Sequence, residues 1–251
     1  MATVLLVLGV GLVMLVWERR RPGRNFPVVS GWWPRAIALN GSQALVAWLA
    51  TATWNKWLPG AALWHAGGHG TVLDALLGYI VITFVYYWWH RARHEVPFLW
   101  RWFHQLHHSA SRIEVLTSFY KHPIEILVNG LLSSWIVFTL LGLDATSAGL
   151  AFAATGLAEL FYHWNVRTPY WLGYVFQRPE SHCVHHQRGH HTNNFSDLPL
   201  WDLLFGTFEN PRIAPDECGF GPAAERRLPA LLLGETVEVA TDRASLSGSA
   251  S

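Results

Sequence analysis

The chain has 251 residues, enough for one domain of ordinary size with a substantial core. Hydrophobic residues make up 51% of it, charged residues only 14%, and it contains 15 tryptophans, which is typical of a membrane protein. A net charge of +1 argues against a nucleic-acid-binding protein, which normally carries a concentrated basic face. The two cysteines, Cys183 and Cys218, suit a reducing, cytosolic environment better than a disulfide framework.

Apolar segments recur along the chain, and each is close to the length that a membrane helix needs. The first is followed by Glu18-Arg19-Arg20-Arg21, which reverses the charge order of a secretory signal, so we expect a retained membrane helix. The third continues as helix to Glu95, and a separate helix over 98–109 is expected near the membrane surface. The predicted membrane segments are residues 2–17, 36–58, 72–89, 124–141 and 147–164.

The distribution of positive charge tests whether these five segments cross the membrane alternately. Residues 18–35, 91–123 and 165–251 hold 17 of the 18 Lys and Arg residues, and the opposite loops hold only Lys56. Because positive loops stay in the cytoplasm, these three stretches are expected there. The sequence therefore predicts an all-α fold: multi-pass transmembrane helices with a cytosolic, helical, histidine-rich cap.

Histidines are concentrated in that cap, since 12 of the 14 lie between positions 90 and 191. Residues three and four apart share a helix face, so each cluster is expected to point at one place. An electrostatic or pH-switching cluster would not need this repeated spacing. The clusters are His90 with His94, then His104, His107 and His108, then His182, His185 and His186, with His163 between them.

Nine imidazoles exceed what one metal ion can accept, so a site for two metal ions is predicted. Imidazole suits iron, zinc and copper, whereas the shortage of thiolates excludes an iron–sulfur cluster. His65 and His69 are also four apart, but the glycine-rich stretch 59–70 predicts a surface loop across the membrane from this site.

Several motifs together resemble the fatty acid hydroxylase/sterol desaturase superfamily of integral membrane di-iron oxygenases, over roughly residues 80–210. The matching pieces are His90-x-x-x-His94, His104-x-x-His107-His108, Lys121-His122-Pro123-Ile124-Glu125, Phe161-Tyr162-His163-Trp164-Asn165, Pro179-Glu180-Ser181-His182-Cys183-Val184-His185-His186, and the closing stretch Asn194 to Thr207.

The resemblance implies that the nine histidines are iron ligands. Some members of the superfamily have a further histidine four residues after the one matching His163, where this chain has Arg167. Candidates for additional ligands, or for side chains that contact the ligands, are His122, His190, His191, Asn165, Glu159, Glu180 and Asp202. The predicted domains are N-terminal membrane helices and loops over 1–70, a catalytic domain resembling this superfamily over 71–222 and a mobile tail over 223–251.

The implied activity is O2-dependent oxidation of a lipid at two iron ions (Fe2+/Fe3+), with electrons from a separate cytochrome b5-like or ferredoxin-like protein. Hydroxylation and desaturation both remain open, as do sterol, fatty acyl, carotenoid and ether-lipid substrates. A non-catalytic membrane metal-binding protein is the alternative from another class. The expected location is the bacterial inner membrane or the endoplasmic reticulum, with the histidine site on the cytoplasmic face and no nucleic-acid partner.

Overall fold

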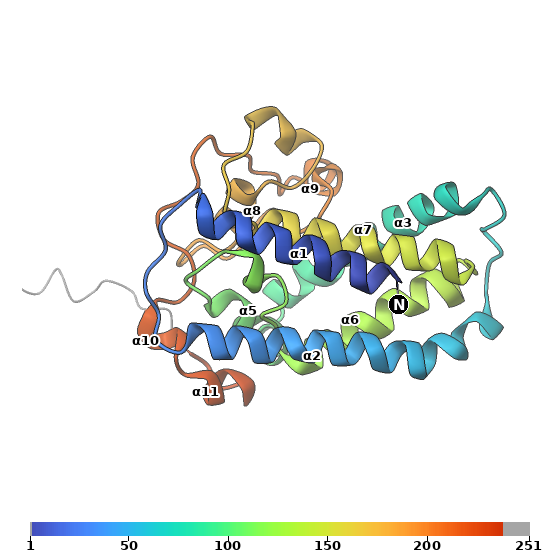
Figure 1. Ribbon diagram of the computed structural model, residues 1–251, viewed down its shortest axis with the longest axis horizontal. Helices are drawn as coiled ribbons and strands as arrows, with labels where there is room; N and C mark the ends of the chain where they lie inside the picture. The colour runs from blue at the N-terminus through green and yellow to red at the C-terminus, as the bar shows by residue number, and fades with distance from the viewer. Residues whose placement is uncertain (1, 238–251) are drawn as a thin grey trace, which may run out of the picture.

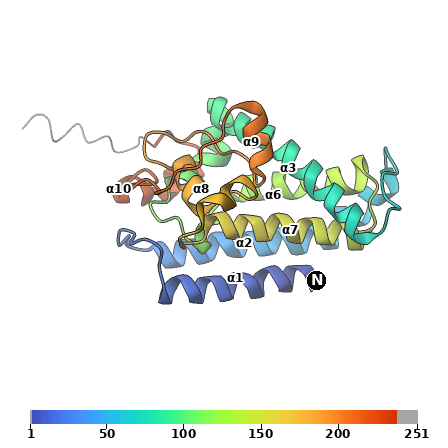
Figure 2. The same ribbon diagram turned by 90° about the horizontal axis from the view of Figure 1, so that it is seen from above.

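Long helices run along the length of the molecule. The computed structural model describes residues 2–237, and within that range it contains helices and no strand. Helix α3 packs against α7, which also packs against α1, while α2 packs against α6 (Figures 1 and 2). The long elements are α1 (Ala2–Arg20), α2 (Trp32–Ala52), α3 (Thr71–Glu95), α6 (Pro123–Ser134) with the π-helical turn η5 (Trp135–Leu140), and α7 (Ala145–His163).

Each predicted apolar segment overlaps one of these helices, and the continuation of α3 to Glu95 is confirmed. Among the described residues, α3 and the stretch Pro123–Leu140 are long and apolar enough to cross a membrane. The segment 36–58 differs from a single helix, because α2 ends at Ala52. The short 3-10 turns η1 (Trp54–Lys56) and η2 (Leu58–Ala61) follow it, and Pro59 stands in the first turn of η2.

The outer faces of the long helices expose large apolar side chains. On α1, Leu5, Leu12 and Val13 are each more than 60% exposed, and Leu73 of α3 is 58% exposed. Water would penalise such continuous apolar surface, whereas the acyl chains of a bilayer would not. These faces therefore agree with a membrane location for the long helices.

Short helices form a cap at the end of the bundle where α3 finishes (Figure 1). Proline begins most of them, which costs no hydrogen bond because the first N–H groups of a helix have no intrahelical partner. A continuous helical run covers the predicted stretch 98–109. The cap helices nearest the histidines are α4 (Pro97–Leu99), the π-helical turn η3 (Trp100–His104), α5 (Gln105–Ser109), α8 (Pro179–His185) and α9 (Pro199–Phe205).

The C-terminal stretch is part of the core of the cap up to residue 237. Helices α10 (Pro222–Glu225) and α11 (Leu228–Leu232) pack against α5, and Leu231 is fully buried in a cluster that includes Leu106 and Phe220. Within the predicted mobile tail over 223–251, residues 223–237 therefore include apolar side chains that complete this core. Residues 238–251 lie outside the described range.

Candidate metal centre

Separate elements bring the nine predicted histidines together in the cap. The last two turns of α3 carry His90 and His94, and the run from η3 into α5 carries His104, His107 and His108. The last residue of α7 is His163. Helix α8 supplies His182 and His185, and His186 follows directly. Ring nitrogens of these side chains form two groups, within each of which the candidate ligand atoms lie within 4.8 Å of one another.

The first group contains five imidazoles whose Nδ1 atoms face acceptors on the outside of the cluster. His90 Nδ1 lies 2.7 Å from the carbonyl oxygen of Phe195, and His185 Nδ1 lies 2.7 Å from that of Asn193. An Nδ1–H held by a carbonyl leaves the Nε2 lone pair free, and these Nε2 atoms turn inward. The group consists of His90, His94, His104, His108 and His185.

The second group contains four buried imidazoles and follows a similar plan. His107 Nδ1 lies 3.3 Å from the carbonyl oxygen of Tyr120, and His163 Nδ1 lies 2.9 Å from that of Glu159, one turn earlier on α7. The group consists of His107, His163, His182 and His186. The two groups adjoin, because the rings of His108 and His186 stack with centroids 4.2 Å apart.

The donor sets fit metal ions. In the first group, His104 Nε2 lies 2.9 Å from His90 Nε2 and 3.1 Å from His108 Nε2. Where Nδ1 carries the proton, as its acceptors favour in His90 and His104, the two Nε2 lone pairs face each other and a cation between them would relieve their repulsion. Imidazole nitrogens gathered this closely form a donor set that suits iron, zinc or copper. The second group shows the same spacing, since His182 Nε2 lies 3.0 Å from His163 Nε2.

Unpartnered nitrogens support the same conclusion. The Nε2 atoms of His94 and His185 and the Nδ1 atom of His186 are buried without a hydrogen-bond partner. A buried polar atom without a partner is costly, so the inward Nε2 atoms of His94 and His185 fit the binding of a metal ion. Burial also lowers the pKa of His185 to about 3 and that of the neighbouring His191 to about 4. Both rings are therefore neutral near pH 7, the form that binds metal.

The grouping corrects the expectation that each histidine triad points at one place. His104 and His108 join the first group, whereas His107 joins the second. His182 and His186 join the second group, whereas His185 joins the first. Successive helical residues are about 100° apart, so residues i and i+4 share a direction more closely than i and i+3. Each short helix thus gives its i, i+4 pair to one group and its third histidine to the other.

Most of the additional candidates do not reach the two groups. His122 caps the start of α6, accepting from Ile124 N–H at Nδ1, and its Nε2 lies 3.0 Å from the carbonyl oxygen of Leu232. His190 Nε2 lies 3.7 Å from Glu209 on the surface. His191 comes closest, with Nδ1 3.1 Å from His108 Nδ1, and its left-handed backbone (φ 43°) aims its carbonyl at His94 Nδ1, 2.8 Å away.

The polar candidates support the cap from outside the groups. The side chain of Asn165 accepts from Arg24 N–H, and the Glu159 carboxylate pairs with Lys121 at 2.6 Å. Glu180 accepts from Thr168 and Asp202 accepts from Phe195 N–H at 2.8 Å. Asp202 thereby holds the loop whose carbonyl contacts His90, and burial raises the pKa of this carboxyl to about 6.

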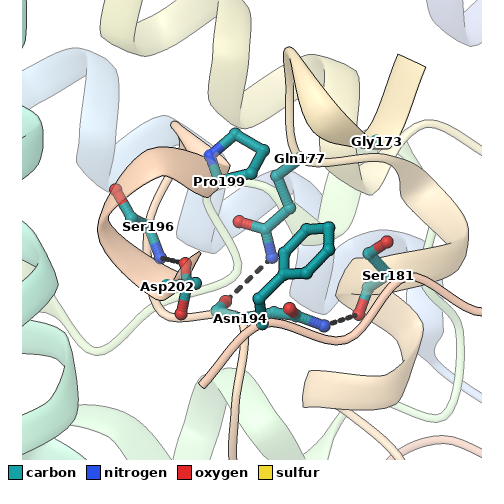
Figure 3. A pocket seen from close by; sticks show the side chains of 8 residues that line it. Gly173, Gln177, Ser181, Asn194, Ser196, Pro199 and Asp202 are labelled. Atoms are coloured by element: carbon teal, nitrogen blue, oxygen red, sulfur yellow. Dashed lines mark hydrogen bonds between the residues drawn. The ribbon is translucent and has the colours of Figure 1, made fainter. Parts of the chain in front are cut away.

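Hydrogen bonds join Asn194 to Gln177 and to Ser181, a residue of α8 (Figure 3). Gln177 Nε2 donates to the carbonyl oxygen of Asn194 at 2.8 Å and lies 3.0 Å from His182 Nδ1. The Asn194 side chain in turn donates to the carbonyl oxygen of Ser181. Gln177 was not predicted from the sequence as a neighbour of a candidate ligand, because only its separation of five residues from His182 could have indicated it.

His65 and His69 lie far from both groups, as predicted. His65 lines a cavity with Asp74 and Asp144, and His69 Nδ1 lies 3.3 Å from Asp74, in the first turn of α3. His90 and His94 lie near the other end of that helix. At 1.5 Å per residue, the separation along the helix is about 24–30 Å.

Residues 75–207, more than half of the chain, match the fatty acid hydroxylase family. The chain belongs to this family. The matched range includes all nine histidines of the two groups. No solved structure matches the chain.

Several curated relatives of this chain are named as enzymes that oxidise lipids. Ornithine lipid hydroxylase OlsE of Rhizobium tropici is 37% identical over 143 residues, which is 55% of this chain and 42% of that protein. Human alkylglycerol monooxygenase is 29% identical over 55% of this chain and 31% of its own length. Fatty acid hydroxylase vlmA of a Lecanicillium species is 29% identical over 68% of this chain and 48% of its own length. The chain thus spans less than half the length of these relatives.

Proposed function

We propose that the protein is a membrane-bound, O2-dependent di-iron oxidoreductase that hydroxylates a lipid. The observation that carries the proposal is the pair of adjoining imidazole groups, in which the Nε2 atoms of His94 and His185 are buried without a partner. Family membership and the printed activities of the relatives support oxidation of a lipid. Hydroxylation is preferred to desaturation because these relatives are named as hydroxylases or monooxygenases.

The nine histidines of the two groups would hold the two iron ions. Iron bound there would supply the redox chemistry that activates O2 and oxidises an unactivated C–H bond. The carbonyls of Phe195, Asn193 and His191 orient three of the rings by accepting from Nδ1, which sets the tautomer that offers Nε2. The buried position of the groups keeps bulk water from the reacting centre.

The proposed orientation places the cap on the cytoplasmic face of the membrane. The near-exclusive placement of Lys and Arg on the cap side supports it. We further propose that electrons arrive from a separate cytochrome b5-like or ferredoxin-like protein. Tags after Arg24 and near His122 should then be cytoplasmic, and a tag within residues 60–70 should lie on the opposite face. A tag in 60–70 on the cytoplasmic side would contradict the threading.

Comparative lipidomics tests the activity. Cells that express the chain should contain a lipid 16 mass units heavier than its precursor, whereas a loss of 2 units would indicate desaturation instead. His185→Ala should abolish the product and lower bound iron, because it removes an unpartnered Nε2 from the first group. His69→Ala is the matched control, since His69 lies at the other end of α3. Iron binding without any lipid product would favour a non-catalytic metal-binding protein.

A further inference from the structure

A buried carboxylate contacts one of the candidate ligands from the outside of the cluster. Glu125, in the first turn of α6, is fully buried, and its Oε1 lies 3.0 Å from His104 Nδ1. The contact is at the nitrogen that faces away from the group, because His104 Nε2 is the atom near His90 and His108. The carboxylate therefore acts on the ring and is not itself among the inward-facing donors.

This contact differs from those of the other imidazoles. Within residues 2–237, the Nδ1 atoms of His90, His94 and His185 face backbone carbonyls, and those of His107 and His163 do so in the second group. Within the same described residues, Glu125 is the one carboxylate that contacts an imidazole of either group. A charged acceptor bonds an N–H about twice as strongly as a neutral one and makes the opposite ring nitrogen a better ligand.

Arg93 holds this carboxylate in place. Arg93 lies on α3 between His90 and His94, is 4% exposed, and donates from Nη1 to Glu125 Oε1. The same Nη1 lies 3.2 Å from His104 Nδ1. Because the guanidinium has only donors, it and the imidazole N–H both converge on the one carboxylate oxygen. His104 then carries its proton on Nδ1 and offers the Nε2 lone pair inward.

We propose that Glu125 is a positioning residue that fixes the tautomer of His104 and strengthens it as a ligand of the first metal ion, with Arg93 as its anchor. The proposal rests on the proposed function, since it needs metal at the first group. It implies an asymmetry between the two metal sites, because no carboxylate contacts the second group in residues 2–237. The first site depends on Glu125, and the second does not.

A matched control exists elsewhere in the cap. Glu225 is also fully buried, and its Oε1 lies 3.1 Å from Arg35 Nη2. Its other oxygen accepts from Ser111 N–H. Glu225→Gln therefore neutralises a buried carboxylate paired with arginine, as Glu125→Gln does, but touches no imidazole of either group. General effects of losing a buried ion pair should appear equally in both variants.

The test uses the full chain in detergent, stripped of metal and titrated with Co2+ against a competing chelator, with the visible absorption of bound Co2+ recorded. The wild type should bind two Co2+ ions, and failure to do so would count against the proposed function itself. Glu125→Gln should weaken one site by about 10–100-fold and change its absorption, while the other site stays within about twofold. Glu225→Gln should bind both ions as the wild type does.

A second variant covers the case in which Glu125→Gln does not fold because Arg93 is left unpaired. The double variant R93Q/E125Q keeps the net charge and should show the same one-site weakening. Equal weakening of both sites, or wild-type affinity at both sites in a folded variant, would overturn the role of Glu125. So would an equal loss of affinity in Glu225→Gln.

Discussion

Acid should destabilise the metal-free protein, and His185 provides a measure of how much. Burial lowers the pKa of its imidazole from 6.5 to about 3. Between these values the unfolded chain binds a proton at this residue and the folded chain does not. The contribution of His185 to the free energy of unfolding is therefore present above pH 6.5 and falls as the pH drops toward 3.

The size of the effect follows from the two pKa values. Between pH 7 and pH 5, protonation of His185 in the unfolded chain lowers the free energy of unfolding by about 2 kcal/mol. Bound metal should oppose this loss because it stabilises only the folded state. The measurement is the denaturant midpoint of metal-free and metal-loaded protein in detergent at pH 7 and pH 5.

His185→Asn is the informative variant for this prediction. The amide can still donate to the carbonyl oxygen of Asn193, which accepts from His185 Nδ1 in the wild type, but it does not titrate. The loss of stability of the metal-free protein between pH 7 and pH 5 should shrink by about 2 kcal/mol in this variant. An unchanged pH dependence would refute the inference that the buried ring is held neutral.

Three other substitutions give further outcomes. His107→Ala and His108→Ala change neighbouring residues that belong to different groups. In the Co2+ titration, each variant should therefore lose a different one of the two bound ions. Loss of the same ion in both variants would contradict the division into two groups. Leu231→Ala should lower the free energy of unfolding by about 2–5 kcal/mol in a denaturant titration, because Leu231 is fully buried. A change below about 0.5 kcal/mol would instead support a mobile C-terminal stretch.

The local features of this protein could be predicted from its sequence. An apolar run long enough to cross a membrane indicates a helix from its length and composition alone, without knowledge of what packs against it. The predicted extension of α3 to Glu95 is an example. The three-four spacing of the histidines indicated metal ligands for a similar local reason, since i, i+4 pairs such as His104 and His108 share a face wherever the helix packs.

Tertiary structure decided which histidines act together. His107 and His185 leave their sequence neighbours because each ring lies against a histidine of the other helix's pair. The ring centroids of His107 and His186 are 4.7 Å apart, and those of His185 and His108 are 4.6 Å apart. The contact of Glu125 with His104 joins residues 21 positions apart on different helices, so no local period reveals it. The burial of Leu231 against Leu106 has the same origin. Spacing along one helix determines the direction of a side chain, but packing between helices determines what it meets.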